Sequence, residues 1–580
     1  MFDVLGKLGW YFKQEWKRYT IAITFLILAG VLEVIPPKLV GMAIDDIQFG
    51  TMTSDKLWIY IGVGALLIIS IYAVTFVWFS KLFGGAFLVE RTLRSRFMTH
   101  LLKMTPTFYE RNRTGDLMAR ATNDLRAVSI TAGFGILTLV DSSAFLLVIL
   151  VTMAYFISWK LTLAALLPLP LMAIAMQKFG SILHNRFTVA QDSFGTMNDA
   201  VLESVAGVRV VRAYVQEKAD EGRFEDLTQD VYRKNTAVAK IDSLFDPTIK
   251  ILVGCSYLIG LGYGAYLVFH NEITLGELVS FNVYLGMLIW PMFAMGELMN
   301  VMQRGGASLD RVNETLAYKP DVADRDQVVH MDKPGQLAFH NVTFRYPSSE
   351  VNNLEQINFK IERGETLGIV GRTGSGKTTL IKQLLREYPV PSGQITLSGK
   401  SIDTLAMDQL LGFVGYVPQD STLFSKTMRE NILFGKKDAT NADVMHALDL
   451  ASFSEDITVL PQGMETLVGE KGVALSGGQK QRVSLARAFI ADPEILLLDD
   501  AMSAVDARTE AKIISNIRRE RAGKTTMIVT HRLSAVQHAS RIVVLDEGRI
   551  VEEGTHEELI AIGGWYKEQY ERQQAEADLG

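Results

Sequence analysis

Cysteine is almost absent from this sequence, and basic residues do not outnumber acidic ones. The single cysteine, Cys255, excludes an intrachain disulfide and any zinc site built from several cysteines. The 58 lysines and arginines against 64 acidic residues give a formal net charge of −6, which argues against a general affinity for nucleic acid. Hydrophobic residues make up 48% of the 580 residues, alongside 21% charged residues. This combination predicts several domains, some facing lipid and some facing water.

The first 18 residues lack the pattern of a cleavable secretory signal. Lys7 and Lys13 interrupt them, and no apolar core leads to a cleavage site of small residues. Apolar residues recur instead at roughly helical spacing: Leu5, Leu8, Tyr11, Phe12 and Trp16. This pattern predicts a helix that lies at the membrane interface before the first span. An ordinary cytoplasmic leader helix is the alternative.

Six apolar runs are long enough to cross a bilayer as helices, which takes about 20 residues each. They lie near 19–40, 57–79, 136–159, 161–179, 249–269 and 278–302. Several contain proline, which membrane helices tolerate where neighbouring helices cover the freed backbone groups. The sequence therefore predicts an all-α transmembrane domain of six long helices, with both of its ends on the same side of the membrane.

Basic residues favour one side of this predicted bundle. They are frequent in the connection between the second and third runs and in that between the fourth and fifth. The turns near 54–56, 158–160 and 270–272, on the other side, are nearly free of them. The positive-inside rule therefore predicts cytoplasmic long connections and cytoplasmic N- and C-termini. Apolar stripes in these connections predict helices that continue beyond the membrane as a stalk, and amphipathic helices on the membrane surface are the alternative.

Acidic and aromatic residues in or near the spans are candidates for contact with cargo. Charged groups are costly in lipid, so they are expected to face the bundle interior or water. The functional interpretation is a cargo pathway or a coupling-proton site, and the structural alternative is an interhelical polar contact or simple packing. The candidate cargo residues are Asp141, Trp290, Phe293 and Glu297.

The composition changes after the last apolar run. Residues 318–334 are polar and contain prolines, which is typical of a linker. From residue 335 onward, short strand-like and helix-like runs alternate, which predicts an α/β domain. The predicted organisation is a transmembrane domain at 1–317, a linker at 318–334 and an α/β domain at 335–580.

The α/β domain carries a phosphate-binding motif. A β-type run at 366–370 leads into Gly371-Arg-Thr-Gly-Ser-Gly-Lys-Thr-Thr379, and a helical run follows. This is G-x-x-x-x-G-K-[ST] in the strand, loop and helix context that the motif requires. The converging backbone N–H groups and Lys377 can bind phosphates, and the Thr378 hydroxyl can bind Mg²⁺. The predicted ATP-binding residues of the loop are Thr373, Gly374, Ser375, Gly376, Lys377, Thr378 and Thr379.

A second apolar run, 495–498, ends in Asp499 and Asp500. A buried strand that delivers a carboxylate at its C-terminal end is how P-loop ATPases hold Mg²⁺ and its water. Thr378 and Asp499 are therefore predicted metal ligands, and ATP with Mg²⁺ is the predicted cofactor pair.

Between these two motifs lies Leu475-Ser-Gly-Gly-Gln479, a hydroxyl and a glycine-rich turn that open a helix and can bind phosphate. At this point the sequence resembles the ATP-binding cassette (ABC) family, whose signature is this pentapeptide. The resemblance implies that two cassettes sandwich two ATP molecules, with each signature capping the nucleotide of the partner cassette. The residues assigned to this role are Ser476, Gly477, Gly478 and Gln479.

The resemblance assigns four more roles in the α/β domain. Tyr346 corresponds to the aromatic residue that stacks on adenine, and Gln419 to the residue that senses Mg²⁺ and contacts the membrane half. Asp506 lies in the loop that crosses the dimer interface. His531 corresponds to the switch histidine near the γ-phosphate, although a lone histidine after a strand is usually structural.

One residue departs from the family pattern. Asp500 stands where active members have a glutamate that acts as general base. Aspartate is one methylene shorter, which sets its carboxylate back by about 1.5 Å from the attacking water and slows hydrolysis by orders of magnitude. We predict that this chain's own site binds ATP but hydrolyses it poorly. A heterodimer with a second, non-identical half-transporter carrying the glutamate is therefore favoured over a homodimer.

The resemblance covers the whole chain and implies the type IV ABC exporter fold, with short coupling helices near 114–126 and 207–216. It predicts ATP-driven export of amphipathic drugs or other small hydrophobic compounds across a bacterial cytoplasmic membrane, catalysed by Asp500, His531 and Gln419. A lipid or peptide exporter with the same engine is one alternative. A ligand-sensing regulatory complex that signals instead of pumping is another, and ATP-dependent accumulation of cargo in vesicles separates it from an exporter.

Overall fold

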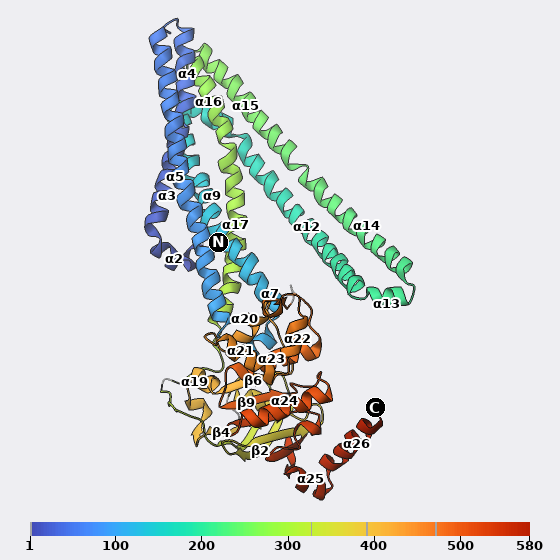
Figure 1. Cartoon of the computed structure of the whole chain (residues 1–580). Helices are drawn as coiled ribbons and strands as arrows, with labels where there is room; N and C mark the ends of the chain where they lie inside the picture. Colours follow the sequence, from blue (N-terminus) through green and yellow to red (C-terminus); the bar gives the residue numbers. More distant parts are fainter. Residues whose placement is uncertain (1–2, 326, 390–391, 470–472, 580) are drawn as a thin grey trace. The chain divides into compact units, whose positions relative to one another are not determined.

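The structure, a computed structural model, describes residues 3–325, 327–389, 392–469 and 473–579, and it divides into two compact units. The first comprises Met1–His100 with Gly115–Ala317, and the second comprises Leu101–Thr114 with Tyr318–Gly580. Figure 1 shows that the first unit is built of helices alone and that the second combines strands and helices.

The first unit begins with two short helices and three long ones. These are α1 (Asp3–Lys7), α2 (Gly9–Gln14), α3 (Trp16–Glu33), α4 (Ile35–Gln48) and α5 (Ser54–Leu101). The break between α3 and α4 falls at Val34, and Pro36 and Pro37 occupy the first turn of α4, where missing N–H groups cost no hydrogen bond.

The next helix of the first unit is interrupted by π-helical turns. Its α-helical parts are α7 (Thr114–Ala119), α8 (Leu125–Ile130), α9 (Ile136–Val140) and α10 (Leu146–Met153), and α11 (Trp159–Leu166) follows after Ser158, whose backbone is extended. The π-helical turns between them are η1 (Arg120–Asp124), η2 (Thr131–Gly135), η3 (Asp141–Phe145) and η4 (Ala154–Ser158). Such turns insert one residue into the helical repeat and often occur at functional sites.

The remaining helices of this unit are α12 (Pro168–Ala206), α13 (Val208–Ala213), α14 (Glu217–Asp242), α15 (Phe245–Phe269), α16 (Leu275–Met287) and α17 (Ile289–Ala317). α12 packs along α14 and α15, with the short α13 at their far end (Figure 1). α16 packs closely on α4, because Gly41 and Gly276 face each other. A Cβ at Gly276 would lie 1.9 Å from the carbonyl oxygen of Gly41, so the two backbones touch without side chains between them.

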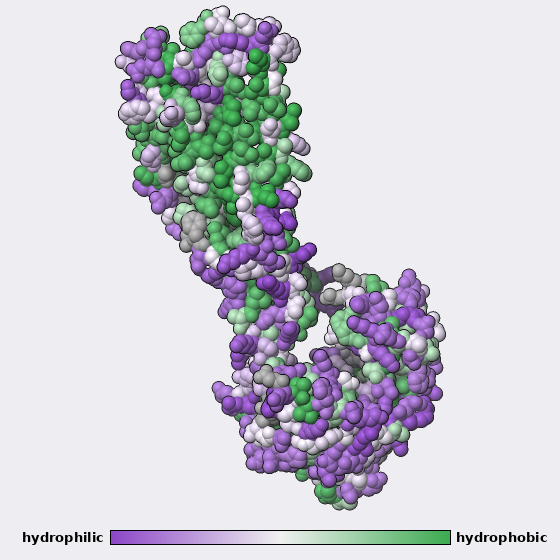
Figure 2. All heavy atoms as spheres, turned by 90° about the vertical axis from the view of Figure 1, so that its left-hand side faces the viewer, coloured by the Kyte–Doolittle hydropathy of each residue, from purple (hydrophilic) through white to green (hydrophobic). Residues whose placement is uncertain are grey.

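Within the described residues, five helices are long and apolar enough to cross a membrane: Trp16–Gln48, Ser54–Leu101, Thr114–Leu166, Glu217–Phe269 and Leu275–Ala317. The sequence predicts six. The predicted run 161–179 covers α11 and the start of α12, and the backbone stays in the α-helical region at Leu167, directly before Pro168, although α12 is not among the five. Gln177 and Lys178 interrupt its apolar start. Figure 2 shows a broad hydrophobic band on the helical unit, with hydrophilic residues at both ends.

The second unit contains a six-stranded sheet of order β12-β11-β3-β10-β9-β6, in which only the edge strand β12 is antiparallel. Its strands are β3 (Thr366–Gly371), β6 (Val414–Val417), β9 (Ile495–Asp499), β10 (Thr525–Val529), β11 (Arg541–Asp546) and β12 (Arg549–Gly554). A four-stranded antiparallel sheet contains β1 (Leu337–Phe344), β2 (Leu354–Ile361), β4 (Ser392–Leu397) and β5 (Lys400–Ser401). The short strands β7 (Lys426–Thr427) and β8 (Leu467–Val468) pair with each other.

Helices cover the six-stranded sheet, and its central strands are buried throughout. The helices of this unit are α6 (Pro106–Arg111), α18 (Lys377–Leu384), α19 (Met407–Gly412), α20 (Met428–Leu433), α21 (Asn441–Leu450), α22 (Ser454–Val459), α23 (Gly477–Ile490), α24 (Ala507–Glu520), α25 (His556–Ile562) and α26 (Trp565–Leu579). Along β9, Leu496 and Leu498 belong to one hydrophobic core and Ile495 and Leu497 to another. The α/β fold predicted for this region is therefore confirmed, because a continuous apolar strand needs cover on both faces.

The segment Leu101–Thr114, which the sequence alone places with the membrane spans, groups with the second unit. Phe108 is buried, and its ring packs edge-on against that of Tyr318 at 4.9 Å. The hydroxyl of Thr105 donates a hydrogen bond to Asp321. These contacts join residues that are far apart in the sequence. A division of the chain by composition therefore does not place this segment with the second unit.

Candidate nucleotide site

The loop between β3 and α18 adopts a path that favours glycine at three positions. Gly371, Gly374 and Gly376 have φ angles of +147°, +82° and +101°. A Cβ at Gly371 would lie 2.1 Å from the carbonyl oxygen of Leu545, and one at Gly376 would lie 2.6 Å from that of Asn353. The loop therefore reaches the N-terminus of α18 without side chains at these three positions. Free backbone N–H groups and the positive potential of a helix N-terminus are thus available in one place.

The loop forms one wall of a cavity of about 290 Å³ at the carboxyl ends of β3, β9 and β10. Its lining residues are Tyr346, Asn353, Thr373, Gly374, Gly376, Lys377, Thr378, Thr379, Gln419, Asp499, Asp500, Val529 and His531. The structure thus brings together the predicted loop, metal, adenine and catalytic residues, except that Ser375 is buried behind the lining. Two lining residues, Asn353 and Val529, have no motif that marks them in the sequence.

Lys377 is buried at the start of α18 and folds back onto the loop. Its Nζ donates hydrogen bonds to the carbonyl oxygens of Gly371, at 2.9 Å, and Arg372, at 2.7 Å. Burial lowers the pKa of Lys377 to about 8, against the opposing attraction of Asp500 and Asp499. Phosphate oxygens would offer this ammonium charged acceptors, which make stronger hydrogen bonds than carbonyls do.

Asp499 ends β9 with one carboxylate oxygen free to bind a ligand. Its Oδ1 accepts a 3.0 Å hydrogen bond from the hydroxyl of Thr378. Its Oδ2 is buried and has no hydrogen-bond partner among the described residues, and burial raises the pKa of this carboxyl. Carboxylate and hydroxyl oxygens are ligands that Mg²⁺ prefers, so these two residues fit the ion, which takes the rest of its shell from water and phosphate. Gln419 lines the same cavity.

Asp500 and His531 both line the cavity. Asp500 has a left-handed backbone, with φ of +46°, and its N–H donates a 2.8 Å hydrogen bond to the carbonyl of Val529. Burial, reinforced by the nearby Lys377, lowers the pKa of His531 below its ordinary value. The imidazole is therefore neutral at physiological pH and can donate one hydrogen bond and accept another.

The aromatic ring expected to stack on adenine is fixed by its neighbours. The hydroxyl of Tyr346 donates a 3.1 Å hydrogen bond to Thr379, and its backbone N–H donates one of 3.1 Å to Asn353. The ring of Tyr388 meets it edge-on at 4.9 Å. Tyr388 is itself buried and donates a hydrogen bond to Glu110 of α6. Sequence reasoning missed Asn353 and Tyr388, because their partners are distant in the chain.

The signature residues lie outside this cavity, at the N-terminus of α23. Ser476 is the N-cap, and its hydroxyl accepts the N–H of Gln479 at 3.3 Å. Gln479 also donates a 2.9 Å hydrogen bond to Asp456. A Cβ at Gly478 would lie 2.6 Å from the carbonyl oxygen of Ala504, so the turn sits against the loop that follows Asp500. Gly477 begins the helix.

Asp506 has a local structural role at the end of this loop. It is the N-cap of α24, and its carboxylate accepts the N–H of Thr509 at 3.0 Å. That backbone hydrogen bond lowers the pKa of Asp506. The residue is exposed and does not line the cavity.

Three of the four candidate cargo residues meet in the helical unit. The indole Nε1 of Trp290, in α17, donates a 2.8 Å hydrogen bond to Asp141 of η3. The ring of Phe293 lies 6.0 Å from that of Trp290, and both rings are about half exposed. Glu297 is one turn further along α17, and its side chain makes no hydrogen bond within the part of the chain that the structure describes.

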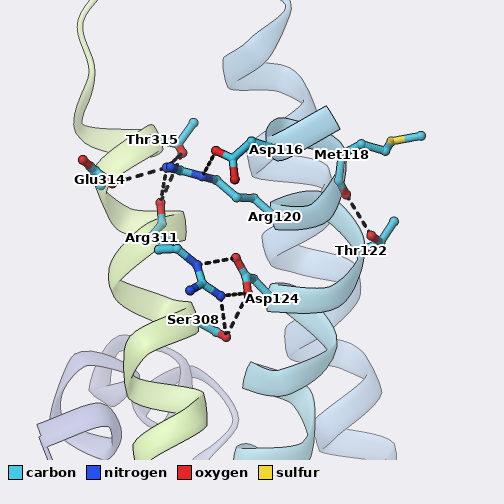
Figure 3. A network of polar contacts seen from close by, with 9 residues as sticks. All are labelled: Asp116, Met118, Arg120, Thr122, Asp124, Ser308, Arg311, Glu314 and Thr315. Atoms are coloured by element: carbon cyan, nitrogen blue, oxygen red, sulfur yellow. Dashed lines mark hydrogen bonds and ion pairs between the residues drawn. The ribbon is translucent and has the colours of Figure 1, made fainter. Parts of the chain in front are cut away.

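A polar network that no sequence motif predicts joins η1 to the end of α17 (Figure 3). Arg120 donates to Asp116 at 2.9 Å, and on α17 to the Arg311 carbonyl at 3.0 Å and the Thr315 hydroxyl at 2.8 Å. Arg311 in turn donates to Asp124 with two guanidinium nitrogens. These hydrogen bonds attach η1 to α17 as far as Thr315, in the last turn of that helix.

A phosphate-binding loop on a parallel sheet, carried by a chain with several membrane-length helices, is the combination expected of an ATP-driven membrane transporter. Two family models agree: the ABC transporter transmembrane region matches residues 19–292, and the ABC transporter model matches residues 354–503.

Relatives match over almost the entire chain. The probable multidrug resistance ABC transporter ATP-binding/permease protein YheI of Bacillus subtilis (strain 168) is 62% identical, over 99% of this chain and 98% of its own. The multidrug resistance-like ATP-binding protein MdlA of Escherichia coli (strain K12) is 41% identical, over 99% of this chain and 98% of its own. The solved structure of a bacterial Atm1-family ABC exporter with ATP bound has a TM-score of 0.77 and 26% identity, covering 96% of this chain and 98% of that one.

The chain belongs to the ABC transporter family. Its fold is that of the type IV ABC exporters, and it is an ATP-hydrolysing transporter with several apolar membrane helices.

Proposed function

We propose that this chain is one half of a heterodimeric exporter that uses ATP to move amphipathic drugs or other small hydrophobic compounds out across the cytoplasmic membrane. Two relatives that match its full length carry multidrug names. The chain also resembles BmrC, one subunit of the bacterial BmrC/BmrD multidrug exporter. A lipid or peptide exporter with the same engine, and a ligand-sensing complex, remain the alternatives that the experiment below separates.

The observation that supports a heterodimer is Asp500. It occupies the general-base position of a cavity whose other lining residues include the predicted phosphate, metal and adenine residues. In this proposal Lys377 and the loop N–H groups hold the phosphates, Tyr346 stacks on adenine and His531 contacts the γ-phosphate. Thr378 and Asp499, with Gln419, hold Mg²⁺, which neutralises phosphate charge when bound. The carboxylate of Asp500 stops about 1.5 Å short of the position a glutamate reaches, so the site retains ATP and hydrolyses it slowly.

The signature turn of this chain supports the second half of the proposal. Ser476, Gly477, Gly478 and Gln479 keep a complete hydroxyl and glycine turn at a helix N-terminus, outside the chain's own cavity. We assign this turn to the ATP of a partner cassette that carries glutamate. Asp506, at the edge of the neighbouring loop, faces the same partner in this arrangement.

The proposed division of labour follows the sequence. We assign residues 1–317 to the transmembrane domain, although Leu101–Thr114 group with the second unit, 318–334 to the linker and 335–580 to the cassette. Residue 326 of the linker lies outside the described residues. We assign coupling to the cassettes to α7 with η1, near 114–126, and to α13, near 207–216. Both termini are placed in the cytoplasm by the positive-inside rule. Asp141, Trp290, Phe293 and Glu297 are assigned to the cargo path.

The test is transport by inside-out membrane vesicles that contain this chain together with a half-transporter of the same family that carries glutamate at the position of Asp500. ATP-dependent accumulation of a fluorescent cationic amphiphile is the expected result, and Lys377→Ala in this chain is expected to abolish it. Lys567→Ala, a half-exposed residue of α26 that does not line the cavity, is the matched control and should transport normally. ATP binding without accumulation of drug, lipid or peptide would favour the sensing complex.

A further inference from the structure

Gln573 of α26 is bonded to the backbone of the loop that carries His531. Its amide oxygen accepts the N–H of Leu533 at 2.9 Å, and its amide nitrogen donates to the carbonyl oxygen of His531 at 2.8 Å. Because one partner is an N–H and the other is a carbonyl, a single orientation of the amide satisfies both. Gln573 therefore holds the two peptide groups on either side of Arg532.

α26 is itself fixed to the second unit. Tyr566 is fully buried in a hydrophobic core of this unit, and Tyr570 packs against the same core. The carboxylate of Glu552, in β12, accepts the backbone N–H of Trp565 at 2.5 Å and that of Tyr566 at 3.2 Å. Positions 566, 570 and 573 are four and three residues apart, so they share one face of the helix. The face that anchors α26 therefore also presents Gln573 to the loop.

The same loop is bonded to the segment that follows β9. Arg532 donates 2.8 Å hydrogen bonds to the carbonyl oxygens of Ser503 and Val505. It also forms a 2.6 Å ion pair with Glu510, whose side chain is buried. These contacts fix the arginine side chain, and they leave the two backbone groups described above to Gln573.

The imidazole of His531 has no side-chain support of this kind. It lines the nucleotide cavity and makes no hydrogen bond within the part of the chain that the structure describes. Its position is therefore set by the backbone of this residue, because the backbone dihedral angles decide which side-chain rotamers are allowed. A misplacement of about 1 Å at a group that contacts substrate can cost a factor of up to about 100.

We propose that Gln573 is a positioning residue of the ATP site, which holds the backbone of His531 so that the imidazole meets the terminal phosphate. This inference rests on the role proposed above for His531. It concerns the chain's own nucleotide site, so it depends on neither the partner nor the cargo. If Gln573 served only to attach α26, its loss would lower stability without affecting one nucleotide more than another.

The test compares the binding of AMP-PNP, a non-hydrolysable ATP analogue, with that of ADP, which lacks the terminal phosphate. Both dissociation constants are measured by fluorescence titration of the full-length chain in nanodiscs. Gln573→Met should weaken AMP-PNP binding about fivefold, the scale of one hydrogen bond, and should change ADP binding less than about twofold. His531→Ala, the reference variant, should weaken AMP-PNP binding about tenfold, because hydrogen bonds to charged phosphate are stronger.

Two further variants separate positioning from stability. Gln573→Glu keeps an acceptor for Leu533 but loses the donor to the His531 carbonyl, so it should behave like Gln573→Met. Gln574→Met is the matched control on the next position. It removes an exposed 2.6 Å hydrogen bond to the hydroxyl of Tyr570 and should leave both affinities unchanged. Adding Gln573→Met to His531→Ala should cause no further loss, because the first acts through the second.

The outcomes distinguish this inference from the role on which it rests. If His531→Ala weakens AMP-PNP binding while Gln573→Met weakens neither nucleotide, or weakens both equally, the positioning role of Gln573 is wrong and that of His531 stands. If His531→Ala leaves the binding of AMP-PNP unchanged, the contact with the terminal phosphate is wrong, and the positioning role is overturned with it.

Discussion

Arg311 donates hydrogen bonds to Asp124 from two guanidinium nitrogens, and this bidentate contact connects α17 to η1 (Figure 3). The hydroxyl of Ser308 donates a further 2.9 Å hydrogen bond to the same carboxylate. The Asp124 side chain is only 9% exposed, whereas that of Arg311 is 51% exposed. Asp124 therefore depends on Arg311 for compensation of its charge far more than Arg311 depends on Asp124.

Replacing Arg311 by methionine should destabilise the helical unit. The change leaves a nearly buried carboxylate with one hydroxyl partner, and we expect a loss of about 2 kcal/mol, below the range for fully buried pairs because Arg311 is half exposed. Asp310→Asn is the matched control on the neighbouring position. It removes an exposed pair with Lys7, so its effect should stay under about 1 kcal/mol. Thermal unfolding in detergent compares them, and equal losses would contradict the argument.

Thr378→Val should weaken the effect of Mg²⁺ on ATP binding. The substitution nearly preserves volume but removes the hydroxyl that touches Asp499. For the unaltered chain we expect ATP affinity to fall when Mg²⁺ is removed with a chelator, and for the variant we expect this difference to shrink by about tenfold. Fluorescent-nucleotide titration with and without Mg²⁺ measures both. An undiminished Mg²⁺ effect in the variant would remove Thr378 from the metal site.

Asp500→Glu should speed hydrolysis at this chain's own site. The added methylene advances the carboxylate by about 1.5 Å, and we expect at least a tenfold gain in turnover at that site within the assembled complex. Asp500→Asn keeps the length but cannot accept a proton, so it should show no gain. Single-turnover hydrolysis, with the partner's site disabled, gives the rate. If aspartate and glutamate support the same rate, the site is not limited by the base.

Asp141→Asn should change selectivity among transported compounds. Asparagine keeps an oxygen that can accept the indole N–H of Trp290, so the local packing survives while the negative charge is lost. We expect transport of cationic amphiphiles to fall severalfold and that of neutral ones to change little. Glu297→Gln is the paired variant one turn away. Unchanged transport of every tested cation by either variant would exclude that residue from the cargo path.

The second unit should lose stability in alkali. Burial raises the pKa of Tyr566 to about 12, and it also raises the pKa values of Tyr388 and Tyr416 above 10. An unfolded chain releases these protons near pH 10, so it binds fewer protons than the folded chain and stability falls as pH rises through 10 to 12. Melting temperatures measured from pH 9 to pH 11 should decline. Tyr566→Phe should decline less steeply, and an identical slope would contradict this origin.

Local motifs named most of the residues that line the candidate cavity, because its strand, loop and helix are consecutive in the chain. Lys377, Thr378 and the paired carboxylates at the end of β9 follow from spacing alone. Asn353 and Tyr388 could not be found that way. Each acts on Tyr346 from a separate element, and an isolated amide or phenol carries no periodic signal.

The helical unit was harder to predict from sequence. Five of the six predicted runs lie in helices that are long and apolar enough to cross a membrane. The fourth run falls on α11 and the start of α12, where Pro168 follows a helical Leu167 and where Gln177 and Lys178 lower the mean hydropathy. Mean hydropathy also could not predict the contact of Gly41 with Gly276, because a glycine has no side chain that would change the average over a sequence window. The Arg311 and Asp124 pair joins positions 187 apart. Such pairs depend on tertiary packing, which single-sequence patterns do not encode.

Asp500 combines the predicted general-base carboxylate with a left-handed backbone conformation at one position. Aspartate enters this region more readily than longer side chains do, because its short polar group can bond to nearby backbone. Lengthening the side chain by one carbon would therefore improve the reach of the carboxylate while straining the turn that presents it. A variant with faster hydrolysis made in this way should be slightly less stable. The hydrolysis rate and the melting temperature should therefore change in opposite directions when this residue is lengthened.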